Sequence, residues 1–195
     1  MLRHCKIKVA RGAERLLRHT SFRRLVRNQD GVAAVEFGMV AAPFLGLLFA
    51  ISELGLVFFA GQTLETATAD AARLILTGQA IGFDATAFKG QVCQRLHGLF
   101  GNASNCTANI MVQVQNLQKT FGDLPPKPRP DPVTGKYPPD AYDGGGPGCV
   151  IVVRVMYVWP VYATLGFNLS DVGPGKRLLM ATAAFRNEPY GAPAC

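Results

Sequence analysis

The strongest pattern in the chain is an apolar run from Phe37 to Ala60 whose only charged residue is Glu53. As a helix, these 24 residues would be roughly 36 Å long, enough to cross a hydrocarbon core of about 30 Å. A soluble domain of this size rarely buries such a helix on every side. The run therefore predicts a membrane-spanning helix over residues 32–61, with Glu53 as its polar position.

Helical periodicity continues beyond the apolar run. Apolar residues recur at spacings of three and four while charged residues occupy the other faces, which is typical of a helix packed on one side. These apolar positions are Leu64, Ala67, Ala71, Leu74 and Ile75. We expect one long helix that reaches about Leu76 and is ended by Gly78. A second, shorter helix is expected over residues 83–100.

Three later runs have strand character. Apolar and mostly polar residues alternate over 110–115, valines and aromatics fill 149–162 with Pro160 near the end, and 178–186 forms the third run. An antiparallel sheet of these strands, laid on the amphipathic half of the long helix, would bury both apolar faces. The predicted fold class is α+β, with a long N-terminal transmembrane helix continuing into a small head with a three-stranded antiparallel sheet.

Proline and glycine saturate residues 122–148, between the first two predicted strands. Neither a helix nor a central strand tolerates that density, so a long surface loop is expected. Such a loop could contact a partner or only connect the strands. Asp131, Asp140 and Asp143 within it lack the spacing of a calcium loop and are interpreted as solvated turn residues.

The formal charge of +7 is carried by the first 30 residues, which hold nine Lys or Arg and two acidic residues. The rest of the chain is balanced. A basic segment directly before a membrane helix is typical of a cytoplasmic flank. We therefore predict a basic cytosolic leader over residues 1–31 and an extracytoplasmic domain over residues 62–195, and no nucleic-acid partner.

The front edge of the apolar run carries the most informative residues. Glu36 is costly at the start of a membrane helix unless a positive charge neutralises it. Cleavage between Gly31 and Val32 would create an ammonium group four residues before Glu36, on the same helix face. Glycine at the cut, glutamate at the fifth mature position and Phe37 next are the pattern of type IV prepilins. The rival interpretation is a secretory signal cut at the small residues 67–69, although the apolar run exceeds a usual signal.

Several segments resemble the TadE-like family, the minor pseudopilins of tight-adherence (Flp) pilus systems. They are GVAAVEF at 31–37, SELG at 52–55, LETA at 64–67, DAAR at 70–73 and RNEPY at 186–190. The resemblance implies a pilin-like head, insertion in the bacterial inner membrane and trimming by a prepilin peptidase. It also implies contacts with other pilins or pseudopilins and with assembly-platform proteins, and a role in building a pilus.

The five cysteines fall into two sets. Cys5 lies in the leader, where a reducing cytosol would keep it a free thiol. The others follow the membrane helix, where an oxidising compartment would pair them in one of three ways: Cys93, Cys106, Cys149 and Cys195. Cys93 with Cys106 is the nearest pair in the sequence. Zinc is disfavoured because there is no CxxC pair and His97 is the only histidine outside the leader.

No nucleophile elbow, P-loop or HExxH motif occurs, so we predict no enzyme activity, no metal and no cofactor. Tyr157, Trp159 and Tyr162 are interpreted as core residues on one strand face, with an exposed aromatic patch or an aromatic belt at the membrane interface as the alternatives. The alternative function is an uncleaved, membrane-anchored periplasmic binding or sensor domain, which would retain residues 1–31.

Overall fold

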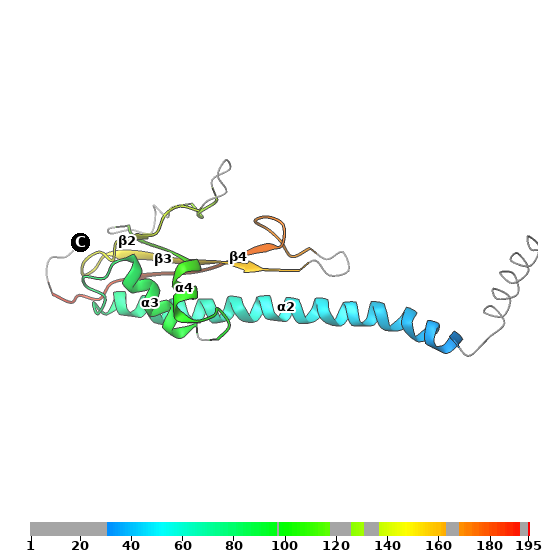
Figure 1. Ribbon diagram of the computed structural model, residues 1–195. Coiled ribbons are helices and arrows are strands. Elements are labelled where there is room, and N and C mark those ends of the chain that lie inside the picture. The colour runs from blue at the N-terminus through cyan, green and yellow to red at the C-terminus, as the bar shows by residue number, and fades with distance from the viewer. Residues whose placement is uncertain (1–30, 97, 118–125, 131–136, 163–167, 192–194) are drawn as a thin grey trace, which may run out of the picture. The chain divides into compact units, whose positions relative to one another are not determined.

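The computed structural model describes residues 31–96, 98–117, 126–130, 137–162, 168–191 and 195 (Figure 1). The predicted leader, with Cys5, lies outside the described residues except for Gly31. The chain divides between Leu48 and Phe49 into two units, each described by itself, and helix α2 (Val32–Leu76) contributes to both.

Helix α2 ends where the sequence predicts. Its last residue is Leu76, and the following Gly78 adopts a φ of +75°, a left-handed conformation that glycine reaches without a Cβ penalty. The amide of Gly78 donates a hydrogen bond to the carbonyl of Ile75 over 3.0 Å. The prediction of one long helix ended by Gly78 is confirmed.

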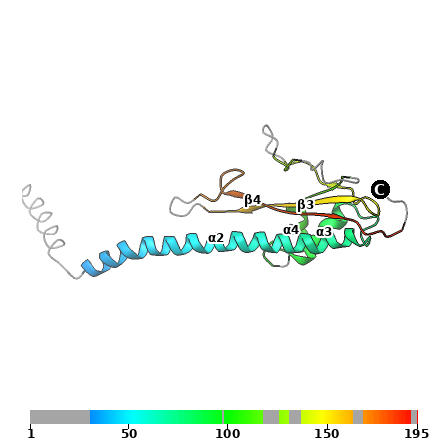
Figure 2. The same cartoon turned by 180° about the vertical axis from the view of Figure 1, so that it is seen from behind.

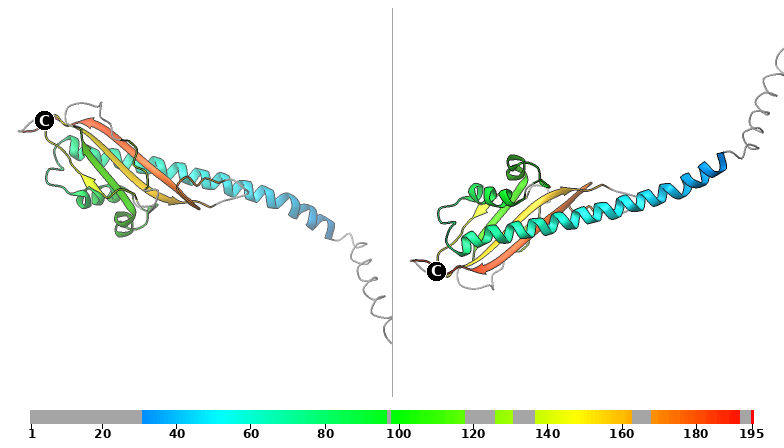
Figure 3. Two further views of the ribbon diagram at one scale, coloured as in Figure 1. Left: turned by 90° about the horizontal axis from the view of Figure 1, so that it is seen from above. Right: turned by 90° about the horizontal axis from the view of Figure 1, so that it is seen from below.

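In the second unit, a sheet lies against one side of the part of α2 that follows Leu48. The buried helix residues recur at spacings of three and four, as the periodicity predicts: Val57, Ala60, Leu64, Ala67, Thr68, Ala71, Ala72 and Ile75. Figure 1 shows the strands along this stretch of the helix, and Figure 3 shows that they cross it obliquely. Alternate residues of the strands, such as Val112, Ile151 and Val153, complete the same core.

The sheet has four strands in the order β2-β1-β3-β4. Strands β1 (Ile110–Asn116), β3 (Val150–Pro160) and β4 (Lys176–Arg186) are antiparallel neighbours, and β3 ends at the proline as expected. The predicted α+β fold is confirmed. The expected number of three strands is wrong, because a short strand β2 (Ala141–Tyr142) pairs with β1 in parallel.

Strand β2 forms at the sheet edge inside the Pro/Gly-rich segment. Pro138 and Pro139 have no amide hydrogen and limit the pairing to the two residues that follow Asp140. The carboxylate of Asp140 accepts a hydrogen bond from the amide of Val112 over 2.8 Å and pairs with Lys89 over 2.5 Å. Asp140 therefore stabilises the β2 edge of the sheet and is not only a solvated turn residue.

The segment expected as one helix over residues 83–100 is shorter in the structure. Helix α3 (Ala85–Arg95) is capped at its N-terminus by Asp84, whose side chain accepts a hydrogen bond from the amide of Ala87. Gly98 and Gly101 then take positive φ values, which a helix cannot contain. A separate helix, α4 (Ala103–Asn109), follows and leads directly into β1.

The other face of the sheet is also buried. Val152, Arg154 and Met156 alternate with the residues that face α2, yet each is less than a tenth exposed. The guanidinium of Arg154 donates to the carbonyl of Pro126 over 2.8 Å, and burial lowers the pKa of Arg154. Figure 2 shows the described parts of the Pro/Gly-rich segment on this side, away from α2. This segment therefore helps to cover the sheet.

Candidate processing and assembly site

The candidate site is the start of α2. Gly31 directly precedes the helix, and a Cβ placed on it would have no atom within 4 Å. Val32, Glu36 and Phe37 are all exposed, Phe37 by 75%. Both sides of the Gly31–Val32 peptide bond are thus open to solvent in the chain as described.

The first turns of α2 place Val32 and Glu36 one turn apart. Residues at i and i+4 of a helix lie on one face, about 5–6 Å apart at their Cβ atoms. A positive charge on the nitrogen of Val32 would therefore share a face with the Glu36 carboxylate. A charge pair at this position could form within one chain or between two neighbouring chains.

Large apolar side chains surround the first half of α2. Contact of so many large apolar side chains with water is unfavourable. Their exposure therefore fits a lipid or protein environment that covers the helix on all sides. The exposed large apolar residues between positions 32 and 51 are Val32, Val35, Phe37, Met39, Val40, Phe44, Leu45, Leu47, Leu48, Phe49 and Ile51. Among the described residues, α2 is the one helix long and apolar enough to cross a membrane. The bounds predicted for the membrane-spanning helix, 32–61, and for the extracytoplasmic domain, 62–195, stay predictions.

Glu53 has a defined partner. Its carboxylate accepts a hydrogen bond from the backbone N–H of Tyr162, which follows β3. The bond spans 109 residues of sequence, so no local pattern could have identified it. A carboxylate near the end of an apolar run is thereby satisfied by the backbone of the head, which lowers the cost of keeping it there.

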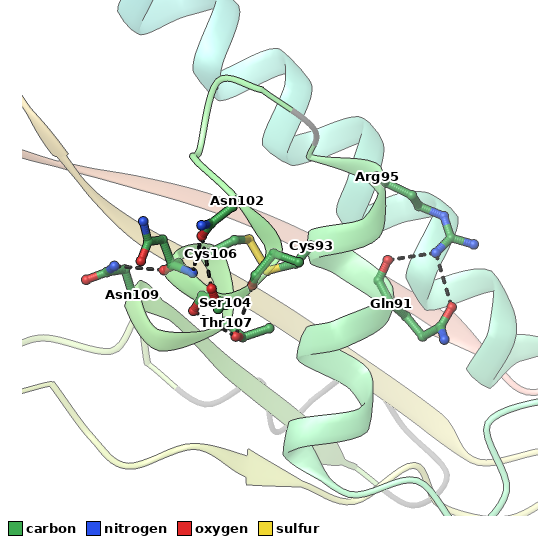
Figure 4. The surroundings of a disulfide bond; sticks show 10 residues. Gln91, Cys93, Arg95, Asn102, Ser104, Cys106, Thr107 and Asn109 are labelled. Carbon is green, nitrogen blue, oxygen red and sulfur yellow. Dashed lines mark hydrogen bonds between the residues drawn. A yellow bond between two sulfur atoms is a disulfide. The ribbon is translucent and has the colours of Figure 1, made fainter.

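The four outer cysteines form two disulfides, Cys93–Cys106 and Cys149–Cys195. The first connects α3 to α4, next to the hydrogen bonds that begin α4 at Asn102 (Figure 4). The second fixes the last residue of the chain to the residue before β3. Of the three pairings left open by the sequence, the structure has the one that joins the nearest pair, Cys93 and Cys106, and leaves Cys149 to pair with Cys195.

Two of the three aromatic residues singled out in β3 and its extension are core residues. The rings of Tyr157 and Trp159 meet Phe100 edge-on, with ring centroids 4.8 and 5.6 Å apart. Tyr162 differs, since it is 77% exposed. The interpretation as core holds for the first two residues and is wrong for Tyr162.

Within the part of the chain that the structure describes, no group of three or more His, Cys, Asp or Glu residues is arranged to hold a metal ion. His97 and Asp131 lie outside the described residues. Asp143 accepts a hydrogen bond from the amide of Gly145, as a turn residue does. The described residues thus offer an exposed segment before and at the start of α2, an apolar helix and a disulfide-bonded head.

Residues 31–73 match the family described as TadE-like protein. The match begins at the glycine before α2 and covers about a fifth of the chain, and it confirms the resemblance seen in the motifs at 31–37, 52–55, 64–67 and 70–73. No curated protein and no solved structure matches the chain. The likeness to TadE-like proteins thus covers Gly31 and most of helix α2.

Proposed function

We propose that the chain is a minor pseudopilin of a tight-adherence (Flp-type) pilus. It is inserted in the bacterial inner membrane by α2, with its leader in the cytosol and its head in the periplasm. A prepilin peptidase cuts it between Gly31 and Val32. Other pilins or pseudopilins and the assembly platform are its partners.

One observation carries this proposal: two boundaries coincide at one peptide bond. The family match begins at Gly31 and the helix begins at Val32, and the apolar side chains that follow on α2 are exposed. A peptidase at the membrane surface needs an accessible bond directly before an apolar helix. The two disulfides support the periplasmic side for the head, because such bonds persist in oxidising compartments.

Glu36 supplies the assembly chemistry in this proposal. After the cut, the Val32 ammonium enters a low-dielectric environment, where an unpaired charge is costly. The Glu36 carboxylate of the same or a neighbouring subunit neutralises it. Because Phe37 and the following apolar residues are exposed, neighbouring helices could pack closely enough to place the two charges together.

The N-terminus of the protein in membranes of a host that carries a prepilin peptidase tests the proposal. Intact mass should show a form that begins at Val32. Gly31→Leu should retain the leader, whereas Gly38→Leu, a matched glycine with no atom within 4 Å of its Cβ position, should still be cut. A form beginning at Asp70 would indicate a secretory signal, and a wild-type chain that keeps the leader would favour the anchored binding domain.

A further inference from the structure

One end of the sheet gathers aromatic and basic residues beside the middle of α2. Strand β3 ends and β4 begins there, since Pro160 pairs with Lys176 and Trp159 with Arg177. Two residues beyond Pro160, the backbone of Tyr162 donates its hydrogen bond to Glu53 of α2. The hydrogen bond thus fixes this end of the sheet at one level of the helix, the level of Glu53.

Glu53 lies in the last part of the exposed apolar stretch of α2. Glu53 lies 21 residues beyond Val32, which corresponds to roughly 32 Å along a helix and is close to the thickness of a hydrocarbon core. Large apolar side chains of α2 are exposed up to Phe59, and from Val57 onward one side of the helix is buried against the head. If α2 crosses a bilayer from its first turn, Glu53 and Tyr162 lie at the headgroup layer.

The chemistry of this end of the head suits that layer. Tyrosine is enriched at membrane interfaces, where its ring meets the acyl boundary and its hydroxyl meets water, and Tyr162 is 77% exposed. Lys176 is also exposed, and a lysine ammonium binds lipid phosphate. The nearby charges have backbone partners, because Arg177 donates to the Leu169 carbonyl and Asp171 accepts from the Leu178 amide.

We propose that the β3–β4 end of the head binds the phospholipid headgroup layer, with the Tyr162 ring in the interface and the Lys176 ammonium on lipid phosphate. Glu53 is the positioning residue, because its carboxylate holds the Tyr162 backbone at the level where α2 leaves the hydrocarbon. The proposal rests on the membrane anchorage proposed above and adds a second membrane contact made by the head.

The single tryptophan of the chain permits a direct test. Trp159→Phe provides a background without tryptophan, and one tryptophan is then introduced into the full-length protein at Tyr162, Ile81 or Phe44. Each variant is reconstituted in phosphatidylcholine–phosphatidylglycerol vesicles that carry bromine at a shallow or a deep acyl position. Ile81 is the matched control, because it is 75% exposed and follows the far end of α2, roughly 35 Å of helix beyond Glu53.

Tyr162→Trp should be quenched more strongly by shallow than by deep bromine, and Ile81→Trp should not be quenched. Phe44→Trp, roughly 18 Å along α2 from Val32, should be quenched more by deep bromine. No quenching at 162 with quenching at 44 would overturn the headgroup contact and leave the anchor intact. No quenching of tryptophan at 44 would overturn the membrane anchorage by α2, and the headgroup contact of the head would be overturned together with it.

The lysine is tested in the same vesicles. Lys176→Glu should reduce the quenching of tryptophan at 162 and leave the quenching at 44 unchanged. Circular dichroism and the disulfide pattern check that this exposed substitution preserves the head. Unchanged quenching at 162 in Lys176→Glu would overturn the assignment of the ammonium to lipid phosphate.

Discussion

The ring of Tyr190 lies against the backbone of Gly78, and its hydroxyl donates a hydrogen bond to the carbonyl of Ile75 over 3.2 Å. The amide of Glu188 donates to the carbonyl of Leu76 over 3.0 Å. The Leu76 carbonyl is one of those that the last turn of a helix leaves without an intrahelical partner, and the Ile75 carbonyl, which also accepts from Gly78, gains a second hydrogen bond. The RNEPY-like segment near the C-terminus therefore closes over the end of α2, and the left-handed glycine makes room for it.

Gly78→Ala should destabilise the head by more than Gly82→Ala. Both glycines have φ near +80°, so alanine is strained at both by about 1 kcal/mol or more. A Cβ on Gly78 would lie 2.6 Å from the Tyr190 ring, whereas one on Gly82 would have no atom within 4 Å. Denaturant unfolding of the full chain in detergent measures both. Equal losses would mean that Tyr190 moves aside at no cost.

Tyr142 should make the head sensitive to alkaline pH. Burial, together with the nearby Tyr190 and Asp143, raises the pKa of Tyr142 to about 12, and its hydroxyl donates to the Ala80 carbonyl over 3.2 Å. The folded state thus holds the phenol proton more tightly than the unfolded chain, whose tyrosine pKa is about 10. The resulting stabilisation is complete below pH 10 and is lost as the pH rises through 12.

Tyr142→Phe keeps the ring beside Phe88 and removes the titrating group. The variant should lose about 0.5–1.5 kcal/mol at pH 8, the usual net value of one hydrogen bond. Between pH 10 and 12 its stability should fall less steeply than that of the wild type. The free energy of unfolding as a function of pH gives both quantities, and parallel curves would show that Tyr142 does not control the alkaline transition.

The sequence predicted the elements whose patterns are local. The spacing before Gly78 located the end of α2, and the alternation of valines located the core strands. It missed β2, because two paired residues beside prolines have no measurable period. It also could not assign Glu53 or Asp140 a partner, since each side chain is satisfied by a backbone amide far away in the sequence. Long-range hydrogen bonds leave no periodic signal.

The two disulfides should contribute unequally to stability. They close loops with sequence separations of 13 and 46 residues, for which loop-closure entropy gives about 3 and about 4 kcal/mol. Replacing Cys149 and Cys195 together by alanine should therefore cost about 1 kcal/mol more than replacing Cys93 and Cys106. Denaturant unfolding of the two double variants in detergent checks the order. Non-reducing digestion with mass spectrometry checks the pairs, and a Cys93–Cys149 peptide or four alkylatable thiols would contradict them.

A substitution at Glu36 can distinguish a role of its carboxylate in assembly from a passive position among the lipid headgroups. If Glu36 only lay among headgroups, replacing it would remove a charge from the edge of the lipid and be harmless. If it neutralises the Val32 ammonium of a neighbouring subunit, its loss leaves that charge without a partner in a low-dielectric setting. The two roles therefore predict opposite outcomes for one substitution.

We expect the Glu36→Gln protein to insert, to be cut after Gly31 and to reach normal levels in the membrane, yet to fail to associate with other pilin-like subunits. Glutamine keeps the shape and removes the charge, so the failure follows from electrostatics and not from packing. Glu36→Asp, which keeps the charge on a shorter side chain, should retain part of the function. Glu65→Gln is the matched control, because it removes an exposed carboxylate from the same helix beyond Glu53. Co-purification of partner pilins and counts of surface pili report the outcome, and normal piliation with Glu36→Gln would show that the carboxylate has no part in assembly.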